Sequence, residues 1–410
     1  MEVSFTPSPD VAIVLNTLLD IFERRKNLTV RSIKVACTDV HLPTYFSQTE
    51  PEPRLVANEQ FQILEQANLV KLVWVPGETN HLLHSVILKT KCATHIYELL
   101  HRSAITDQRA HLETLLLADQ FRFPKDDWRT RAIHRILTQL RDGRSPTPFN
   151  LTDSSWNLDL LTVLSALSTL EPETPYRVFS VRTFNNSKRF DELKSAIVRL
   201  TRHANPEWKT LSAEDILREL NLVANPNYIH LAGNWQFATQ GGEILSLGGF
   251  IPSVGFPAVQ VETIQSITIH ADSVLCIENL TSFHEFLCTQ KTRKTEYATL
   301  CLMGNPSPSI RRLLRLVPET IHIHLWSDMD YGGFNILSQM RRYVRHQIHP
   351  YLMDISTFEK YAHLSRPLTH TDIRNLKYLQ TRPELADVQA TIEHLIYRGL
   401  KLEQEAIQTR

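Results

Sequence analysis

The chain has 410 residues, of which 44 are basic and 44 acidic, so its formal net charge is zero. A chain of this length can hold two or three domains. With 42% apolar and 21% charged residues it is an ordinary globular protein, which excludes a disordered or collagen-like chain. Zero net charge excludes a global attraction to polyanions, so nucleic-acid binding depends on local basic patches.

The cysteines and the N-terminus indicate the compartment. The five cysteines form no Cys-x-x-Cys pair, which indicates a reducing compartment and no zinc site. Residues 1–10 lack the basic and apolar stretches of a signal peptide, and no apolar run approaches the roughly 18 residues of a membrane span. We therefore expect a cytoplasmic protein that does not enter a membrane.

Residues 1–92 are predicted to form a winged-helix domain. Asp10 begins a helix with apolar residues at helical spacing, and a second helix is expected over 57–69. The runs 70–75 and 82–89 around the turn 76–80 predict a two-stranded wing. The second helix carries Glu59 and Glu65 but no Lys or Arg, which favours phosphate contact or partner docking over reading of a DNA sequence.

The middle of the chain is predicted to contain two further segments. Residues 93–175 form a helical connector, with helices near 95–102, 106–119, 126–141 and 156–170 and a Pro-rich hinge candidate at 143–148. Residues 176–265 form a mixed α/β lead-in, in which half of the glycines punctuate short strands between Gly233 and Gly255. Short basic clusters at 24–26, 291–294, 311–315 and 341–345 are candidate phosphate contacts or solvated helix faces.

Residues 266–410 carry the strongest chemical signal. The apolar run 273–277 ends at Glu278, and the run 321–326 is followed by Asp328 and Asp330, each before a predicted helix. Parallel strands would bring the three carboxylates to one edge of a sheet, where hard oxygens suit Mg²⁺ or Mn²⁺. A single Asp-x-Asp is weak, because Asp favours turns. The order of the elements strengthens the prediction. The strand that ends at Glu278 is followed by a helix, a strand over 298–303, a helix over 309–317 and the strand that ends at the Asp-x-Asp. This order favours a metal site for phosphodiester chemistry.

This order resembles the Toprim signature of topoisomerases, primases and nucleases. The resemblance implies that Glu278, Asp328 and Asp330 bind a catalytic metal. A more specific resemblance is to the JetD nuclease family of Wadjet plasmid-defence systems, which is related to the topoisomerase VI A subunit. Four segments carry this resemblance: Tyr176–Phe190, Glu278-Asn279, Trp326–Gly333 and Gly399–Glu405. The implied fold is α/β, with an N-terminal winged helix, a helical linker and a C-terminal Toprim domain whose Rossmann-like sheet is mostly parallel.

The resemblance also implies the activity and the partners. It predicts a Mg²⁺-dependent or Mn²⁺-dependent endonuclease that hydrolyses duplex, closed circular plasmid DNA. The protein would be a homodimer that acts beside a condensin-like complex of SMC, kleisin and kite subunits. Glu403 and Glu405 are candidate ligands of a second metal if their segment is extended, and they diverge if it is helical. Lys188 and Arg189, and more weakly Lys401, are candidate DNA contacts.

Two other functions stay open. A transesterase of the topoisomerase VI kind would use a winged-helix tyrosine, and that region contains only Tyr45, outside an Arg-x-x-Tyr-Tyr context. Hydrolysis by water is therefore favoured. A non-catalytic DNA-binding or SMC adaptor would keep the carboxylates as a remnant, although an idle cluster of like charges is costly to hold together.

Overall fold

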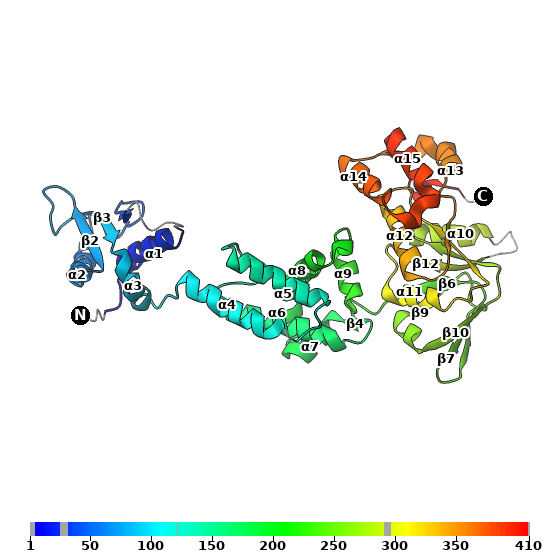
Figure 1. The fold of residues 1–410 in the computed structure, drawn as a ribbon, viewed down its shortest axis with the longest axis horizontal. Coiled ribbons are helices and arrows are strands. Elements are labelled where there is room, and N and C mark those ends of the chain that lie inside the picture. Colours follow the sequence, from blue (N-terminus) through cyan, green and yellow to red (C-terminus); the bar gives the residue numbers. More distant parts are fainter. Residues whose placement is uncertain (1–4, 25–31, 121, 291–296, 409–410) are drawn as a thin grey trace. The chain divides into compact units, whose positions relative to one another are not determined.

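A computed structural model describes residues 5–24, 32–120, 122–290 and 297–408. The chain divides into two compact units, Met1–Asn157 and Leu158–Arg410 (Figure 1). Both units contain helices and sheets, so the predicted mixed α/β class is confirmed, while the winged-helix and Toprim assignments stay predictions. Within the described ranges, no helix combines the length and the apolar character that crossing a bilayer requires.

The first part of the N-terminal unit is a small sheet packed against three helices. The helices are α1 (Pro9–Arg24), α2 (Glu52–Gln66) and α3 (Ala93–Leu99), and the antiparallel strands are β1 (Ile33–Ala36), β3 (Leu83–Leu88) and β2 (Val70–Trp74), in that order across the sheet. The predicted hairpin is present, and β1 adds a third strand that the sequence analysis did not predict. Helix α2 begins before the predicted Ala57 and ends before Asn68, which has a left-handed φ of 58°.

The rest of this unit is helical, as predicted. It comprises α4 (Ile105–Gln120), α5 (Trp128–Arg141) and the start of α6 (Ser154–Ala166). The hinge candidate at 143–148 is tied to α6, because the indole N–H of Trp156 donates to the carbonyl of Pro148 at 3.0 Å. The boundary between the two units falls inside α6 and not at this segment.

The C-terminal unit continues from α6 into a layer of helices and then into short strands. The helical layer contains α7 (Tyr176–Phe184), α8 (Arg189–Ala204) and α9 (Ala213–Glu219), with a two-stranded parallel pair of β4 (Thr174–Pro175) and β5 (Leu222–Val223). The glycine-rich stretch forms strands, as expected: β6 (Tyr228–Ala232), β7 (Trp235–Thr239), β8 (Ile244–Ser246), β9 (Val254–Pro257) and, beyond it, β10 (Ile264–Ile269).

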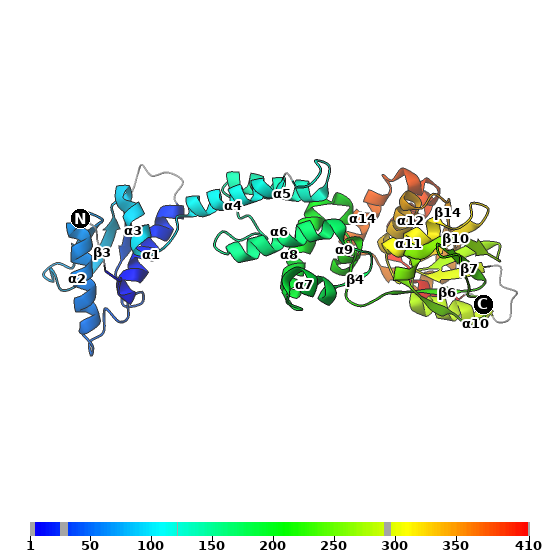
Figure 2. The same cartoon turned by 90° about the horizontal axis from the view of Figure 1, so that it is seen from below.

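A six-stranded sheet forms the centre of this unit, in the order β14-β13-β11-β12-β6-β9. The four strands β11 (Ser273–Ile277), β12 (Tyr297–Cys301), β13 (His322–Trp326) and β14 (Ile348–Pro350) are parallel, whereas β6 pairs antiparallel with β12 and β9 pairs antiparallel with β6. The crossover helices are α10 (Leu280–Gln290), α11 (Pro308–Arg315) and α12 (Tyr331–Tyr343). Figure 2 shows α10 on one side of the sheet and α11 and α12 on the other, as right-handed crossovers require.

The C-terminal segment packs onto the same core. It contains α13 (Ile355–Tyr361), β15 (Arg366–Pro367), α14 (His370–Leu379), α15 (Gln389–Arg398), β16 (Leu400–Lys401) and a 3₁₀ turn at Gln404–Ala406. Leu395, Leu402 and Ile407 are buried in one cluster with Leu275 and Leu325 of the sheet. The sequence Ser282-Phe-His-Glu285 has the pattern of a capping box, which predicts a helix start at Ser282. This prediction is wrong, because Ser282 lies inside α10, with a buried hydroxyl that has no hydrogen-bond partner in the described part of the chain.

Candidate active site

Adjacent parallel strands carry the predicted carboxylates to one edge of the sheet. Strands β11 and β13 are neighbours, with Ile277 opposite Trp326. Glu278 follows the last residue of β11 directly, and Asp328 and Asp330 lie in the short link between β13 and α12. The edge is therefore formed by the strand ends, where ligands bind in open α/β sheets.

Glu278 and Asp328 are held together by hydrogen bonds. The amide of Glu278 donates to the carbonyl of Trp326 at 3.0 Å, which joins the two strand ends. In return, the amide of Asp328 donates to Oε2 of Glu278 at 3.3 Å. The side-chain amide of Asn279 donates to Oδ1 of Asp328 at 3.4 Å. Both acidic side chains therefore have fixed positions relative to the sheet.

Asp330 begins α12, and two glycines let the helix start close to the strand end. Oδ1 of Asp330 accepts from the amide of Gly333 at 3.1 Å, as an N-cap carboxylate does. A Cβ atom at position 333 would lie 2.0 Å from the carbonyl oxygen of Asp328. Only glycine allows the first turn of α12 to approach the Asp-x-Asp backbone this closely.

The C-terminal segment completes the site. Met329 and Leu402 form an isolated antiparallel bridge, which lays residues 402–405 beside the Asp-x-Asp link. The amide of Gln404 donates to Oδ1 of Asp328 at 2.7 Å. The side chain of Gln404 donates to the carbonyl of Trp326 at 2.9 Å and accepts from the amide of Asn279 at 3.1 Å. Gln404 is fully buried and positions both strand ends.

Sequence reasoning did not identify Gln404. The residue lies in the Gly399–Glu405 segment, where the neighbouring glutamates drew attention. A glutamine in a polar stretch is mostly exposed, and no local pattern indicates that it is buried against strand ends that lie 78 and 125 residues away in the chain. Only the Met329–Leu402 pairing, which is a tertiary contact, reveals its role.

Burial and like charge raise the pKa of both central carboxyl groups. Burial, and then the charge of Asp328, raises the pKa of Glu278 to about 8, with smaller contributions from Asp330 and Glu405. Burial raises the pKa of Asp328 to about 6, and the charges of Asp330, Glu405 and Glu403 add to this effect against the hydrogen bond from Gln404. A bound cation would relieve this repulsion.

The donor set fits a hard cation that keeps part of its water shell. Across the described residues, no three His, Cys, Asp or Glu side chains are grouped so that they could hold one metal ion between them. Mg²⁺ does not need such a cage, because it commonly binds through one or two carboxylates together with waters and substrate phosphates. Asp328 and Asp330 on one short link, with Glu278 beside them, provide that kind of site.

The other predicted site residues differ in their surroundings. Glu403 is extended and forms an ion pair with Arg366 at 2.7 Å, and Glu405 is exposed in the following 3₁₀ turn. Both lie close enough to Asp328 for their negative charges to raise its pKa. They are near the site, but neither contacts the other carboxylates directly through a hydrogen bond among the described residues.

The predicted DNA contacts are placed unequally. Arg189 forms ion pairs with Asp159 at 2.6 Å and with Glu192, and Lys401 pairs with Asp372 at 3.4 Å. Both cations therefore hold elements of the fold together. Lys188 is exposed at the start of α8 and remains a candidate for phosphate contact.

The basic clusters on α11 and α12 also have structural partners. Arg311 binds Glu219, Arg341 binds Asp387 and Arg342 binds Glu207, each at 2.6 Å. Arg315 and Arg345 of the same clusters are exposed and form no ion pair within the described ranges, so each cluster keeps one candidate for phosphate contact. Of the cluster at 24–26 only Arg24 is described, as the last residue of α1, and the cluster at 291–294 lies outside the described residues.

Two comparisons with known proteins give the same family name. Residues 247–410, which include the central strands and the C-terminal segment, match the family model "Wadjet protein JetD, C-terminal". The chain is 22% identical over 326 residues to the Wadjet protein JetD of Bacillus cereus (strain Q1), an alignment that covers 78% of this chain and 77% of that protein. The predicted resemblance to JetD is confirmed.

Proposed function

Because residues 247–410 match the family model of the JetD C-terminal part and most of the chain aligns with a JetD protein, we propose that the protein is the metal-dependent DNA endonuclease of a Wadjet-type plasmid-defence system. The observation that carries the proposal is the group of Glu278, Asp328 and Asp330 at the ends of adjacent parallel strands. Their mutual repulsion is costly in the free protein. A divalent cation bound with a phosphodiester substrate would neutralise these charges, which gives a reason for grouping the three carboxylates.

The roles of the residues follow from their positions. Asp328 and Asp330 would hold Mg²⁺ or Mn²⁺, which when bound neutralises charge on the reacting phosphate oxygens. Glu278 presents Oε2 beside the amide of Asp328 and would either complete the ligand set or accept the proton of the attacking water. Gln404 and Asn279 orient Asp328 through their hydrogen bonds to Oδ1.

The surroundings of Tyr45 support hydrolysis over tyrosine transesterification. Tyr45 is fully buried, and its hydroxyl donates to Oδ1 of Asn58 at 2.8 Å and accepts from the amide of Leu83 at 2.9 Å. Burial raises the pKa of Tyr45 to about 12, so the phenolate is not formed at neutral pH. A buried, fully hydrogen-bonded hydroxyl cannot attack a phosphate.

The exposed face of α2 supports a protein partner for the N-terminal unit. Leu55, Val56 and Ile63 are exposed by 59%, 45% and 38% on one helix that also carries exposed acidic residues. Acidic groups repel a DNA backbone and apolar groups offer it no attraction, whereas a protein surface can bind both. The partners in the proposal are circular duplex DNA, a complex of SMC, kleisin and kite subunits, and a second copy of the chain.

Plasmid cleavage tests the proposal. The purified protein should nick or linearise closed circular DNA with Mg²⁺ or Mn²⁺, and Asp328→Ala should reduce the rate by at least about 100-fold, since charge stabilisation of the transition state is lost. Chelation with EDTA should have the same effect. Circular dichroism and thermal melting should show that the variant is folded. Full cleavage by a folded protein with both Asp328→Ala and Asp330→Ala would overturn the proposal.

A further inference from the structure

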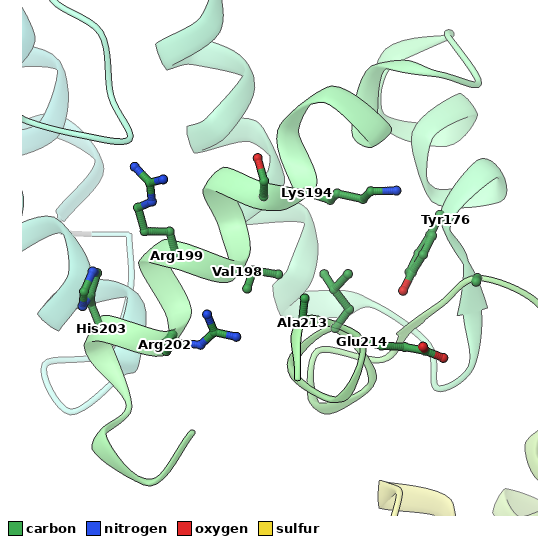
Figure 3. Close-up of a pocket in the computed structure, with 11 residues that line it drawn as sticks. Tyr176, Lys194, Val198, Arg199, Arg202, His203, Ala213 and Glu214 are labelled. Carbon is green, nitrogen blue, oxygen red and sulfur yellow. The ribbon is translucent and has the colours of Figure 1, made fainter. Parts of the chain in front are cut away.

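We infer that a groove between α8 and α9 binds the phosphate backbone of DNA. The groove has a volume of about 630 Å³ and lies in the C-terminal unit, where Tyr176 and Ala224 also line it. Figure 3 shows that Lys194 and Arg202 extend from α8 toward the side of Tyr176 and Glu214, whereas Arg199 and His203 line the groove from the opposite side of the helix. The choice of DNA as the ligand of this groove rests on the proposed function.

The cationic wall follows from helical spacing. Groove residues of α8 recur as neighbouring pairs at 194–195, 198–199 and 202–203, so they form one stripe along three turns of the helix. The buried side chains of Val198 and Leu217 form an apolar floor. Segment 176–205 contains seven Lys or Arg and only two Asp or Glu, in a chain whose net charge is zero.

The cations of this wall are only partly neutralised: Lys194 pairs with Asp191 at 3.0 Å, but Arg199 and Arg202 have no carboxylate partner among the described residues. Arg199 is exposed and forms no ion pair with any residue that the structure describes. Arg202 donates to the carbonyl of Leu211 at 3.0 Å, while its buried Nε has no partner in the described part of the chain. The carboxylate across the groove, Glu214, is already paired with Arg218 at 2.8 Å. An anion therefore meets uncompensated positive charge.

The length of the cationic row favours a nucleic-acid strand over a single phosphate compound. From Lys194 to Arg202 the helix rises by about 12 Å. Successive phosphates of one DNA strand are spaced about 3.4 Å along the helix axis, so the row can run beside several of them. Tyr176 adds an aromatic ring, with Nζ of Lys194 at 5.8 Å from the ring centroid.

The groove is fixed to the candidate active site. Glu219 of α9 binds both terminal nitrogens of Arg311 at 2.6 and 2.7 Å, and Asn305 donates to Asp215 at 3.1 Å. In the link between α8 and α9, Thr210 forms a side-chain hydrogen bond with Tyr331, which follows Asp330 directly. A strand held in the groove would therefore be held at a fixed position relative to the carboxylates.

Binding of labelled duplex DNA in EDTA tests the inference separately from cleavage. Arg199→Glu should weaken binding about 10-fold at low salt, and Arg199→Ala should reduce the slope of log affinity against log salt by about 1. The matched controls are Lys377→Glu and Lys377→Ala, since Lys377 is an exposed cation on α14 outside the groove. The controls should bind DNA like the unchanged protein.

Three results would overturn the inference. The first is an unchanged affinity and salt slope in both Arg199 variants. The second is an equal loss in the Lys377 variants, which would indicate a general charge effect. The third is calorimetric binding of ATP that Arg199→Ala abolishes while DNA binding is unchanged, which would make the groove a nucleotide site. DNA binding is measured in EDTA, without metal and without cleavage. The test of the groove therefore gives the same answer whether or not the protein is a nuclease.

Discussion

Gln404 shows how one buried side chain can organise an active site. Its amide group joins Trp326 of β13 to Asn279 after β11, and its backbone amide holds Asp328. The three contacts fix both strand ends through one residue of the C-terminal segment. A site of this kind depends on a residue that has no chemical role of its own.

We expect Gln404→Ala to lower the free energy of unfolding by about 1–3 kcal/mol, because buried partners lose their hydrogen bonds. Cleavage should fall as well, since Asp328 is less well positioned. Denaturant unfolding and plasmid nicking measure the two effects. Gln408→Ala, a matched change at an exposed position, should alter neither. Equal stability of the two variants would contradict the positioning role.

A substitution at Tyr45 distinguishes hydrolysis by water from tyrosine transesterification. Tyr45→Phe should leave the cleavage rate per folded molecule unchanged, because water is the proposed nucleophile. It should lower the free energy of unfolding by about 1–3 kcal/mol, since Asn58 and Leu83 lose a buried partner. Tyr397→Phe, at a side chain that is 86% exposed, is the control for stability. Protein trapped covalently on DNA ends would instead indicate transesterification.

At the scale of elements, the junction of β13 and α12 decides where the Asp-x-Asp backbone lies. The first turn of α12 reaches the carbonyl of Asp328 only because residue 333 has no side chain. Asp330 caps the same turn, so the helix start and the candidate metal ligand cannot move independently. A displacement of the helix therefore becomes a displacement of the site.

Gly333→Ala should abolish or strongly reduce cleavage, because its Cβ would meet a backbone oxygen at 2.0 Å and the helix has to shift. The variant should also melt at a lower temperature. Gly249→Ala provides a matched control, since a Cβ there meets no atom within 4 Å. A Gly333→Ala protein with normal melting temperature and normal cleavage would show that the close approach is not needed.

At the scale of the whole molecule, net charge limits what the isolated chain can do. With 44 basic and 44 acidic residues the protein has little long-range attraction to DNA. Contacts from a few basic groups give weak binding that falls steeply with salt. One carboxylate site cuts one strand, so a double-strand break needs two copies whose sites face opposite strands.

We therefore expect the isolated chain to cleave relaxed linear DNA poorly at physiological salt. Addition of the SMC complex with ATP and circular DNA should raise the rate strongly, because bending of a short duplex costs on the order of several kcal/mol and the complex can supply it. Time courses of nicking and linearisation measure the gain. Equal rates with and without the complex would contradict this expectation.

The sequence by itself determined the mixed α/β class, the positions of most helices and strands, and the order of carboxylates at strand ends. Local periodicity and turn residues are sufficient for that. Only the tertiary structure decided which charged groups are free. Arg189, Arg311, Arg341 and Lys401 look like DNA contacts in the sequence, yet distant acids neutralise them, whereas Arg199 is left exposed. Ion pairing and the burial of Gln404 depend on residues far apart in the chain, which no local pattern encodes.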